Sequence, residues 1–361
     1  MLIDTSYTRR GFSGTSVYIE QLVSALRERP GLHVATATQR VRLGREQGPG
    51  RLGWARSGLN AVLDGLWLHV GLPRAARLSR ADLVHHPLPA HSRRIHVPQV
   101  CTVHDLAFIA RPAGYGRLWR VLAKRAYRRA ARRGAAIVCP SEASARDAIT
   151  LLGADPERVL VAPHGPGQVV RATTTPEASP SGASPSPTGP LVFVGDAEER
   201  KNLRGLLDAY ALYRSRTAGA AELVLAGRSA ERAVDPGVSG RPALSSKALL
   251  ALLGEARALV QPSAHEGFGL TPLEAMALGV PVLAVATPAT REICGDAALL
   301  VETDGLADGM GRIASDSRLR TDLARRGRER VAGFSWSHSA RLHERAYTLA
   351  IGGSTDPSGT Q

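Results

Sequence analysis

Residues 261–281 read QPSAHEGFGLTPLEAMALGVP, and this stretch decides the predicted fold. The apolar run Ala258–Val260 ends at Pro262, which predicts that a buried strand gives way to a loop there. Gly267 and Gly269 let the backbone turn tightly and direct its N–H groups toward a ligand, because no Cβ stands in the way.

A helix follows this loop directly. Pro272 is typical of a first helical turn, and Gly279 ends the apolar helical pattern. The order strand, glycine-rich loop, helix N-terminus gathers backbone donors and the positive end of a helix dipole, which suits a phosphate. Glu266 and Glu274 flank the loop and would accept hydrogen bonds from neutral hydroxyls, such as those of a sugar and a ribose. The alternative is that Glu266 caps the helix and Glu274 is a solvated surface residue.

Residues 266–282 follow the pattern Glu-Gly-Phe-Gly-Leu-x-Pro-x-Glu-Ala-Met-Ala-x-Gly-x-Pro-Val. This pattern resembles the Glu-x7-Glu signature of the retaining GT-B glycosyltransferases, in particular glycosyltransferase family 4. The resemblance implies an α/β fold of two Rossmann-like domains with parallel sheets facing a central cleft. It implies that Glu266 holds a hydroxyl of the donor sugar and that Glu274 holds the ribose. It also implies that the loop amides bind the sugar and the diphosphate, namely those of Gly267, Phe268, Gly269, Leu270 and Thr271.

Length and composition predict two globular domains. A chain of 361 residues with 43% hydrophobic residues is long for one core and can fill two. Its three cysteines, Cys101, Cys139 and Cys294, lie far apart at the ends of apolar runs, which predicts buried thiols rather than disulfides or a zinc site. The net charge of +14 would suit a nucleic acid, an anionic lipid or a nucleotide diphosphate, although only 4% of the residues are aromatic, which disfavours single-stranded nucleic acid.

The sequence predicts a cytoplasmic protein. Met1 leads directly into an apolar strand, so no secretory signal is expected. The most apolar internal window, residues 59–72, is too short for a transmembrane helix and contains Asp64.

Two residues of the first half are candidates for the site. Gly14 lies in a turn that precedes a helical pattern starting at Ser16, and a tight structural turn is the alternative. His104 ends the predicted strand Val97–His104, and ligands bind at the carboxyl ends of parallel strands. The resemblance places Gly14 opposite the donor phosphates and His104 beside the donor sugar, whereas an isolated histidine would be an interior residue.

The segment Arg111–Arg133 holds nine basic residues and no acidic one. Leu118, Trp119 and Leu122, with Ala126 and Ala130, fall at helical spacing, which predicts that one apolar stripe packs. The cationic remainder would lie on an anionic membrane at the inner face of the cell membrane, or would simply be solvated.

The second half opens with a linker and a strand. Residues 172–190 are almost all Thr, Ser, Pro, Gly and Ala, which predicts an extended connection. After the strand Leu191–Gly195, Arg200 and Lys201 resemble the diphosphate-binding residues of the family, and their charges suit a departing diphosphate. Relatives carry an arginine directly after this strand, where this chain has Asp196.

The resemblance, together with these patterns, implies an N-terminal acceptor domain (1–170) completed by a C-terminal helix (336–350), a linker (171–190), a donor domain (191–335) and a disordered tail (351–361). The predicted activity is hexosyl transfer, mannosyl-like by preference, from a GDP- or UDP-linked sugar to a glycan, lipid-linked or small-molecule hydroxyl. We expect catalysis by His104, Arg200, Lys201 and Glu266, with no metal and no cofactor beyond the donor. A non-catalytic, membrane-associated relative of the same fold is the alternative.

Overall fold

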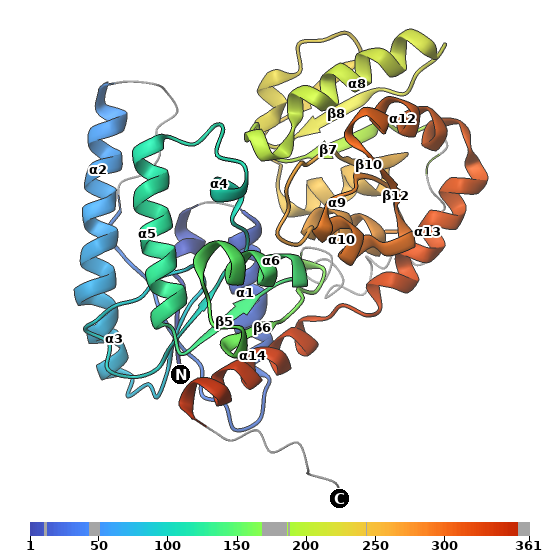
Figure 1. The fold of residues 1–361 in the computed structure, drawn as a ribbon. Helices are drawn as coiled ribbons and strands as arrows, with labels where there is room; N and C mark the ends of the chain where they lie inside the picture. The colour runs from blue at the N-terminus through green and yellow to red at the C-terminus, as the bar shows by residue number, and fades with distance from the viewer. Residues whose placement is uncertain (11–12, 43–50, 168–185, 187, 243, 353–361) are drawn as a thin grey trace, which may run out of the picture.

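The computed structural model describes residues 1–10, 13–42, 51–167, 186, 188–242 and 244–352. Within these residues the chain forms two parallel sheets of six strands each. Figure 1 shows that the sheets belong to two lobes, the first blue to green and the second yellow to orange. The predicted α/β architecture with two parallel sheets is therefore confirmed.

The first sheet has the strand order β2-β1-β3-β4-β5-β6. Its strands are β1 (Leu2–Asp4), β2 (Ala35–Ala37), β3 (Val84–His86), β4 (Gln99–Thr102), β5 (Ala136–Cys139) and β6 (Val159–Val161). The central strands β3, β4 and β5 are buried along their whole length. Helices cover both faces of such a sheet, which is why its strands are apolar on both sides.

The helices of the first lobe follow these strands. They are α1 (Gly14–Arg27), α2 (Arg51–Leu66), α3 (Leu72–Leu78), α4 (Ala107–Ala110), α5 (Arg117–Arg133) and α6 (Glu142–Asp147). Shorter helical segments are η1 (Ser6–Arg10), η2 (Trp67–Gly71), η3 (Ala148–Leu152) and η4 (Pro156–Arg158). The glycine-rich sequence that follows Thr36 predicts a loop as far as Arg56, but this prediction was wrong at its end, because α2 begins at Arg51. The glycines that suggested a loop lie mostly before that residue.

The second sheet has the order β12-β11-β10-β7-β8-β9. Its strands are β7 (Leu191–Val194), β8 (Leu223–Ala226), β9 (Val238–Arg241), β10 (Ala258–Gln261), β11 (Val282–Val285) and β12 (Leu299–Val301). The sequence did not predict β9 and β12. Both are edge strands that are only partly buried, so neither carries the continuous apolar run of the central strands.

The helices of the second lobe are α8 (Leu203–Arg216), α9 (Ser246–Gly254), α10 (Leu270–Ala277), α11 (Pro288–Cys294), α12 (Leu306–Ser315) and α13 (Ser317–Val331). Short segments are η5 (Glu199–Lys201), η6 (Arg228–Arg232), η7 (Gly295–Ala297) and η8 (Thr303–Gly305). The last helix, α14 (Trp336–Ile351), runs one residue past the predicted end.

The helix α14 returns to the first lobe, as its red ribbon in Figure 1 shows. Its side chains Trp336, Ala340 and Tyr347 join the core that also holds Tyr18 and Val138 of the first lobe. The chain therefore crosses between the lobes twice. Most of the predicted linker, 171–190, and the tail from 353 lie outside the described residues.

The predicted apolar stripe of α5 was wrong. Leu118, Trp119 and Leu122 are 73%, 53% and 59% exposed, and Ala126 is exposed as well. Only Ala130 of the predicted stripe is buried, because the helix packs through its C-terminal half. Periodicity identified the helix and its apolar residues, but it could not tell that no element of the described residues covers them.

All three cysteines are free and buried, as predicted. Among the described residues, no helix combines the length and the apolar character that crossing a membrane requires.

Candidate functional site

The loop before α10 is shaped by two glycines. Gly269 adopts a φ of 113° and precedes the helix, which begins at Leu270, two residues before Pro272. A Cβ at Gly267 would overlap the carbonyl oxygen of His104, so only glycine permits this approach. The loop of the second lobe thus packs directly against the end of β4 in the first lobe.

Two serines of the first lobe hold this contact. The Ser141 hydroxyl donates to the Gly267 carbonyl oxygen at 2.6 Å. The Ser144 hydroxyl lies 2.8 Å from the same oxygen and 2.8 Å from the carbonyl oxygen of His104, and its single hydrogen can serve one of them at a time. Ser141 is also the N-cap of α6, since its hydroxyl accepts from the Ser144 amide.

Glu266 is the centre of the charged groups at this loop. Its Oε1 accepts hydrogen bonds from Nζ of Lys201 at 2.7 Å and from Nε2 of Gln261 at 2.6 Å. Its Oε2 lies 3.5 Å from a guanidinium nitrogen of Arg200. The structure therefore brings together three predicted site residues that lie on two separate segments of the chain.

Backbone hydrogen bonds fix these two segments to each other. The Ala264 amide donates to the Arg200 carbonyl oxygen at 2.9 Å. The side-chain amide of Asn202 donates to the Pro262 carbonyl oxygen at 3.3 Å, while Asn202 itself adopts the left-handed conformation that joins η5 to α8. The positions of the cations are thus set by the backbone as well as by their charges.

The charges outweigh the burial of Glu266. Burial by itself raises the pKa of this carboxyl, but Lys201 and Arg200 lower the pKa to about 2, so the group is ionised. Burial likewise opposes the charge of Arg200, yet Glu266, Asp105 and Glu198 raise the pKa of its guanidinium. Both residues are therefore fully charged at neutral pH.

His104 lies across from these charges, under the loop. Its Nε2 is 3.0 Å from the Pro87 carbonyl oxygen, so Nε2–H donates and Nδ1 is left as an acceptor. Burial lowers the pKa of His104 to about 4, against the opposing effect of Asp105. A neutral imidazole with a fixed tautomer results, and its ring packs edge-on against Tyr18 at 4.7 Å.

A chain of buried hydrogen bonds supports the end of β4. The Tyr347 hydroxyl lies 2.9 Å from Nδ1 of His85, whose Nε2 lies 2.9 Å from the Thr102 hydroxyl. That hydroxyl lies 2.7 Å from the Tyr18 hydroxyl, which lies 3.0 Å from Nε2 of His343. Burial lowers the pKa of both histidines, to about 4 for His343. The network joins α14 to α1, β3 and β4.

The other predicted residues of the second lobe lie in α10 or in the loop before it. Glu274 is buried in α10, and its Oε1 lies 3.4 Å from where a Cβ of Gly167 would stand. The Phe268 side chain is buried against His164 at 4.9 Å, so Phe268 can offer a ligand its backbone only. Leu270 and Thr271 are partly buried in the first turn of α10.

Gly14 begins α1, whose N-terminus is capped by Ser13 and Ser16. A Cβ at Gly14 would stand 3.5 Å from Cδ1 of Leu270, the first residue of α10. The N-termini of two helices, one from each lobe, therefore approach each other at the loop. Both contribute first-turn backbone N–H groups and positive partial charge, which suits an anion.

Several residues of this region were missed by sequence reasoning. Glu292 of α11 accepts from the amides of Glu142 and Ala143 at 2.8 and 3.1 Å, which fastens the second lobe to the start of α6. The sequence could not show which amides Glu292 would pair with, since the partners are 150 and 149 residues apart.

Asp196 stands where the resemblance implies an arginine, and it pairs with an arginine from another segment of the chain. Both carboxylate oxygens of Asp196 accept hydrogen bonds from Arg228, at the end of the adjacent strand β8. The side-chain hydrogen bonds of Arg228 lower the pKa of Asp196, and Lys201 and Arg200 act in the same direction. A third cation thus lies at the same edge of the second sheet as Arg200 and Lys201.

Among the described residues, no three His, Cys, Asp or Glu side chains are grouped so that they could hold a metal ion.

Two family models match the chain. The model described as Glycosyltransferase Family 4 matches residues 12–165, and that described as Glycosyl transferases group 1 matches residues 175–330. Between them they include every predicted site residue.

Curated relatives resemble parts of the chain. The O-antigen chain mannosyltransferase B of Escherichia coli is 32% identical over 175 residues, which cover 45% of this chain and 46% of that protein. The D-inositol 3-phosphate glycosyltransferase of Pseudarthrobacter chlorophenolicus is 29% identical over 240 residues, covering 60% and 56%. The matches span about half the length of these curated relatives.

Solved structures share the fold along nearly the whole chain. Sucrose-phosphate synthase from Thermosynechococcus elongatus superposes with a TM-score of 0.69 at 18% identity, covering 98% of this chain and 99% of that one. WaaG, a glycosyltransferase of lipopolysaccharide biosynthesis, gives 0.66 at 17% identity, covering 98% and 100%. Anabaena HepE in complex with UDP and glucose gives 0.63 at 15% identity, covering 96% and 98%. At these identities the likeness establishes the fold.

Proposed function

Because the chain belongs to glycosyltransferase family 4, within the group 1 glycosyltransferases, we propose that it is a retaining enzyme that transfers a hexosyl group from a nucleotide diphosphate sugar to an acceptor hydroxyl. The observation that carries this proposal is the contact of Lys201 and Arg200 with Glu266 beside the N-terminus of α10. This contact places two cations and the loop amides, which suit a diphosphate, beside a carboxylate that can accept hydrogen bonds from sugar hydroxyls.

In the proposed reaction, the bond between the anomeric carbon and the diphosphate oxygen breaks, and the diphosphate departs with the electron pair. The acceptor oxygen forms the new bond, and its proton passes to the departing phosphate oxygen. Arg200 and Lys201 stabilise the charge that grows on the leaving group. Glu266 keeps both cations in place, and it is ionised at neutral pH, so it can accept hydrogen bonds from the sugar.

The neutral His104 serves the donor sugar differently. Its Nε2 is committed to the Pro87 carbonyl oxygen, so its Nδ1 is the atom that would accept a hydrogen bond from a sugar hydroxyl. Glu274 would hold the ribose, and the amides from Gly267 to Thr271 would hold the sugar and the diphosphate. Gly14, at the N-terminus of α1, would face the phosphates from the other lobe.

The names of similar proteins narrow the donor within this proposal. The Escherichia coli relative is a mannosyltransferase, and so is the MMP alpha-(1->4)-mannosyltransferase of Mycolicibacterium hassiacum, which is 37% identical over 115 residues. HepE is solved with UDP-glucose. A GDP- or UDP-linked hexose, mannose by preference, is the donor we infer, without a metal or a further cofactor.

The acceptor would be a glycan, a lipid-linked sugar or a small molecule, handled by a protein that works in the cytoplasm. The proposal includes peripheral contact of the segment Arg111–Arg133 with an anionic membrane and no binding of nucleic acid. A non-catalytic relative of the same fold is the rival. It is disfavoured because a chain that binds no nucleotide sugar would have no need to cluster the partly buried cations Arg200 and Lys201 with Glu266.

Calorimetric titration with a panel of nucleoside diphosphates and nucleotide sugars tests the proposal. We expect selective binding of one nucleoside diphosphate, weakened at least ~10-fold in Glu274→Ala because the ribose loses its acceptor. Glu255→Ala changes an exposed carboxylate at the end of α9 and should bind like wild type. No binding to any member of the panel would favour the non-catalytic rival.

A further inference from the structure

The first turns of α5 expose an unusual amount of apolar surface. Leu118, Trp119, Val121 and Leu122 are 73%, 53%, 60% and 59% exposed. Trp119 is nevertheless held in place, because it stacks on Tyr115 at 5.7 Å with an angle of 15° and packs edge-on against Phe108 at 5.3 Å. Exposed apolar side chains that are clustered and held in place mark a surface that binds a protein, a ligand or a membrane.

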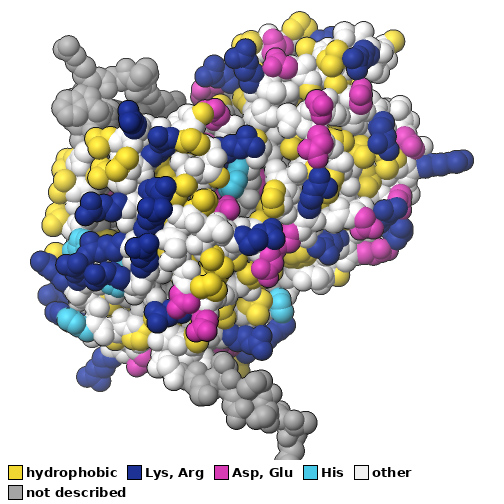
Figure 2. Space-filling view, viewed as in Figure 1, with side chains coloured by type: hydrophobic (Ala, Val, Ile, Leu, Met, Phe, Trp, Pro, Cys, Tyr) yellow, Lys and Arg dark blue, Asp and Glu magenta, His cyan; other side chains and the backbone are white. Residues whose placement is uncertain are grey.

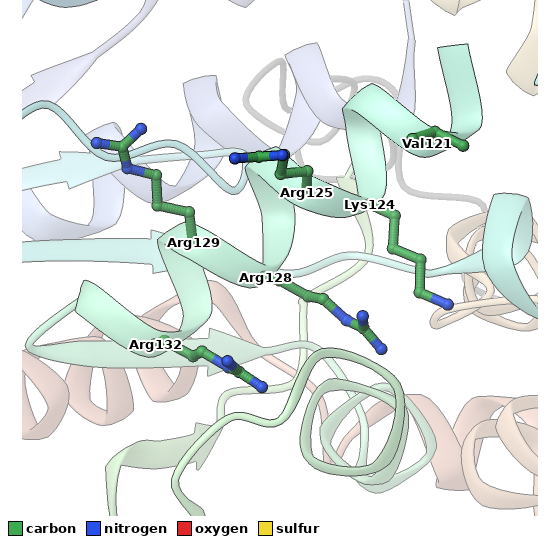
Figure 3. Close-up of a pocket in the computed structure, with 6 residues that line it drawn as sticks. All are labelled: Val121, Lys124, Arg125, Arg128, Arg129 and Arg132. Carbon is green, nitrogen blue, oxygen red and sulfur yellow. The ribbon is translucent and has the colours of Figure 1, made fainter. Parts of the chain in front are cut away.

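The same helix carries eight Lys and Arg residues and no Asp or Glu. Figure 2 shows the dark-blue side chains gathered over the first lobe, and Figure 3 shows that they extend from α5 around a shallow surface hollow. Lys124, Arg128 and Arg132 project to one side of the helix in Figure 3, and Arg125 and Arg129 to the other. None of these five cations lies within ion-pair distance of a carboxylate of the described residues.

Some of the exposed apolar residues of α5 and some of its cations lie on the same face of the helix. Leu118, Leu122, Arg125 and Arg129 are spaced by four, three and four residues, so they lie on one face of α5. The buried residue Ala130 lies on a different face. One exposed face is therefore apolar at its N-terminal end and cationic toward its C-terminal end.

This apolar end lies close to the candidate site. Burial raises the pKa of Tyr115, whose ring stacks on Trp119, and the nearby Arg200 side chain acts in the opposite direction. A Cβ at the neighbouring Gly114 would stand 2.6 Å from Oε2 of Glu199. The residues just before α5 thus touch the second lobe at the segment that carries Arg200 and Lys201.

We propose that the exposed face of α5 docks the protein on an anionic lipid bilayer, with Leu118, Trp119, Val121 and Leu122 inserted at the interface and the arginines against the head groups. Charge complementarity selects this occupant, since each cation near an anionic leaflet adds to binding and Trp prefers the interface. A protein partner would instead need an acidic surface as long as the helix. Given the proposed function, on which this orientation rests, docking presents the site to acceptors anchored in the bilayer.

Co-sedimentation with vesicles tests the docking. We expect the full chain to bind phosphatidylcholine vesicles that contain about 30 mol% phosphatidylglycerol, and to bind pure phosphatidylcholine much less. Replacing Arg125, Arg129 and Arg132 by Gln should weaken binding about 100-fold, and the triple change Leu118→Ser, Trp119→Ser, Leu122→Ser about 10-fold or more. Raising the salt to about 1 M should release the wild type.

Matched controls remove the same groups elsewhere. Replacing the exposed Arg204, Arg312 and Arg318 of the second lobe by Gln removes the same charge, and Leu212→Ser with Val234→Ser removes exposed apolar side chains. Both controls should bind vesicles like wild type. Equal losses in control and α5 variants would overturn the proposal, because net charge or general stickiness would then explain the binding.

Two further outcomes separate the docking from the proposed function. Nucleoside diphosphate binding in solution should be unchanged in the Leu118, Trp119, Leu122 variant, which also shows that it is folded. Vesicle binding that is absent, while nucleotide binding persists, overturns the docking and leaves the proposed function intact. Self-association that the same variant abolishes, without vesicle binding, would assign the face to a second copy of the chain.

Discussion

Two groups of cations in this chain look alike in sequence and differ completely in structure. Arg200 and Lys201 belong to the second lobe, where their side chains are 20% and 15% exposed and contact the nearly buried Glu266. The cations of α5 lie on the first lobe, most of them exposed, on a helix that has no acidic residue. The fold fixes the positions of Arg200 and Lys201, whereas it leaves most cations of α5 exposed to solvent.

The difference teaches that burial decides what a charge can do. A buried cation must have a partner, because desolvation without one is very costly, so Arg200 and Lys201 have fixed positions and suit catalysis. An exposed cation is stabilised by water and keeps its freedom, so it contributes to long-range attraction rather than to precise geometry.

Removal of Lys201 should break this comparison most severely. Lys201→Ala leaves Glu266 with one cation fewer, and we expect loss of roughly 3 kcal/mol of unfolding free energy together with a fall in transfer rate of ~100-fold or more. Urea unfolding and steady-state kinetics measure the two effects. The chain supplies its own controls, since its other lysines are Lys124 on α5 and the exposed Lys247 on α9. Wild-type turnover in the Lys201 variant would refute the assigned role.

Lowering the pH should neutralise Glu266 and so remove the charge that pairs with Arg200 and Lys201. The pKa of Glu266 is lowered from 4.5 to about 2, so its ionised form stabilises the fold at every pH above its unfolded value. This contribution, about 3 kcal/mol, is lost as the pH falls from 4.5 toward 2. Chemical unfolding at a series of pH values would show it, and Glu266→Gln should lack that step.

Buried histidines add a second loss of stability on acidification, in a pH range above that of Glu266. Burial lowers the pKa of His104 and of His343 from 6.5 to about 4, so each is neutral in the fold and gains a proton more readily on unfolding. Their contribution is present above pH 6.5 and is lost as the pH falls toward 4, by about 3 kcal/mol for each. A stability profile flat between pH 7 and 4.5 would contradict this.

Glu292 extends the comparison to a carboxylate that pairs with backbone amides. We expect Glu292→Ala to cost about 1 kcal/mol, since α6 loses acceptors for two N–H groups. The same change should loosen the contact of the lobes, which small-angle scattering would report as a larger radius. Glu302→Ala is the control, because the Glu302 side chain pairs with the exposed Arg291 at the surface of the second lobe. Identical scattering of both variants and wild type would argue against this contact.

Neutralising the exposed cations should have the smallest effect on the fold. The change of Arg125, Arg129 and Arg132 to Gln should alter the unfolding free energy by no more than about 0.5 kcal/mol for each substitution, because exposed charges without close partners contribute little. Thermal unfolding measures it. A loss of several kcal/mol would mean that these side chains have partners in solution and would sharpen the contrast in the opposite direction.

The sequence predicted the central part of the fold better than its margins. The central strands β4, β7 and β10 were predicted because they read as uninterrupted apolar runs between turn signals. The edge strands β9 and β12 were missed, since an edge strand can be polar. The helix α2 was not predicted, because the glycines before and at its start suggested a loop as far as Arg56.

The candidate site was predicted on similar terms. Glu266 and Lys201 were named from local motifs, and the structure brings them to 2.7 Å. Ser144, Glu292 and Tyr115 were not named, since a serine, a glutamate or a tyrosine in a helix or loop is ordinary until its partner is known.

By itself, the sequence determined the secondary structure of the two cores, the glycine-rich loop before α10 and the residue types at the site, because each depends on neighbours along the chain. Only the tertiary structure decided which charges are buried. It pairs Glu266 with Lys201, brings the Gly267 carbonyl oxygen to the Ser141 hydroxyl, and leaves Trp119 about half exposed. Burial depends on segments that are distant in sequence, and solvation by water or by protein then sets the charge state and strength of each polar group.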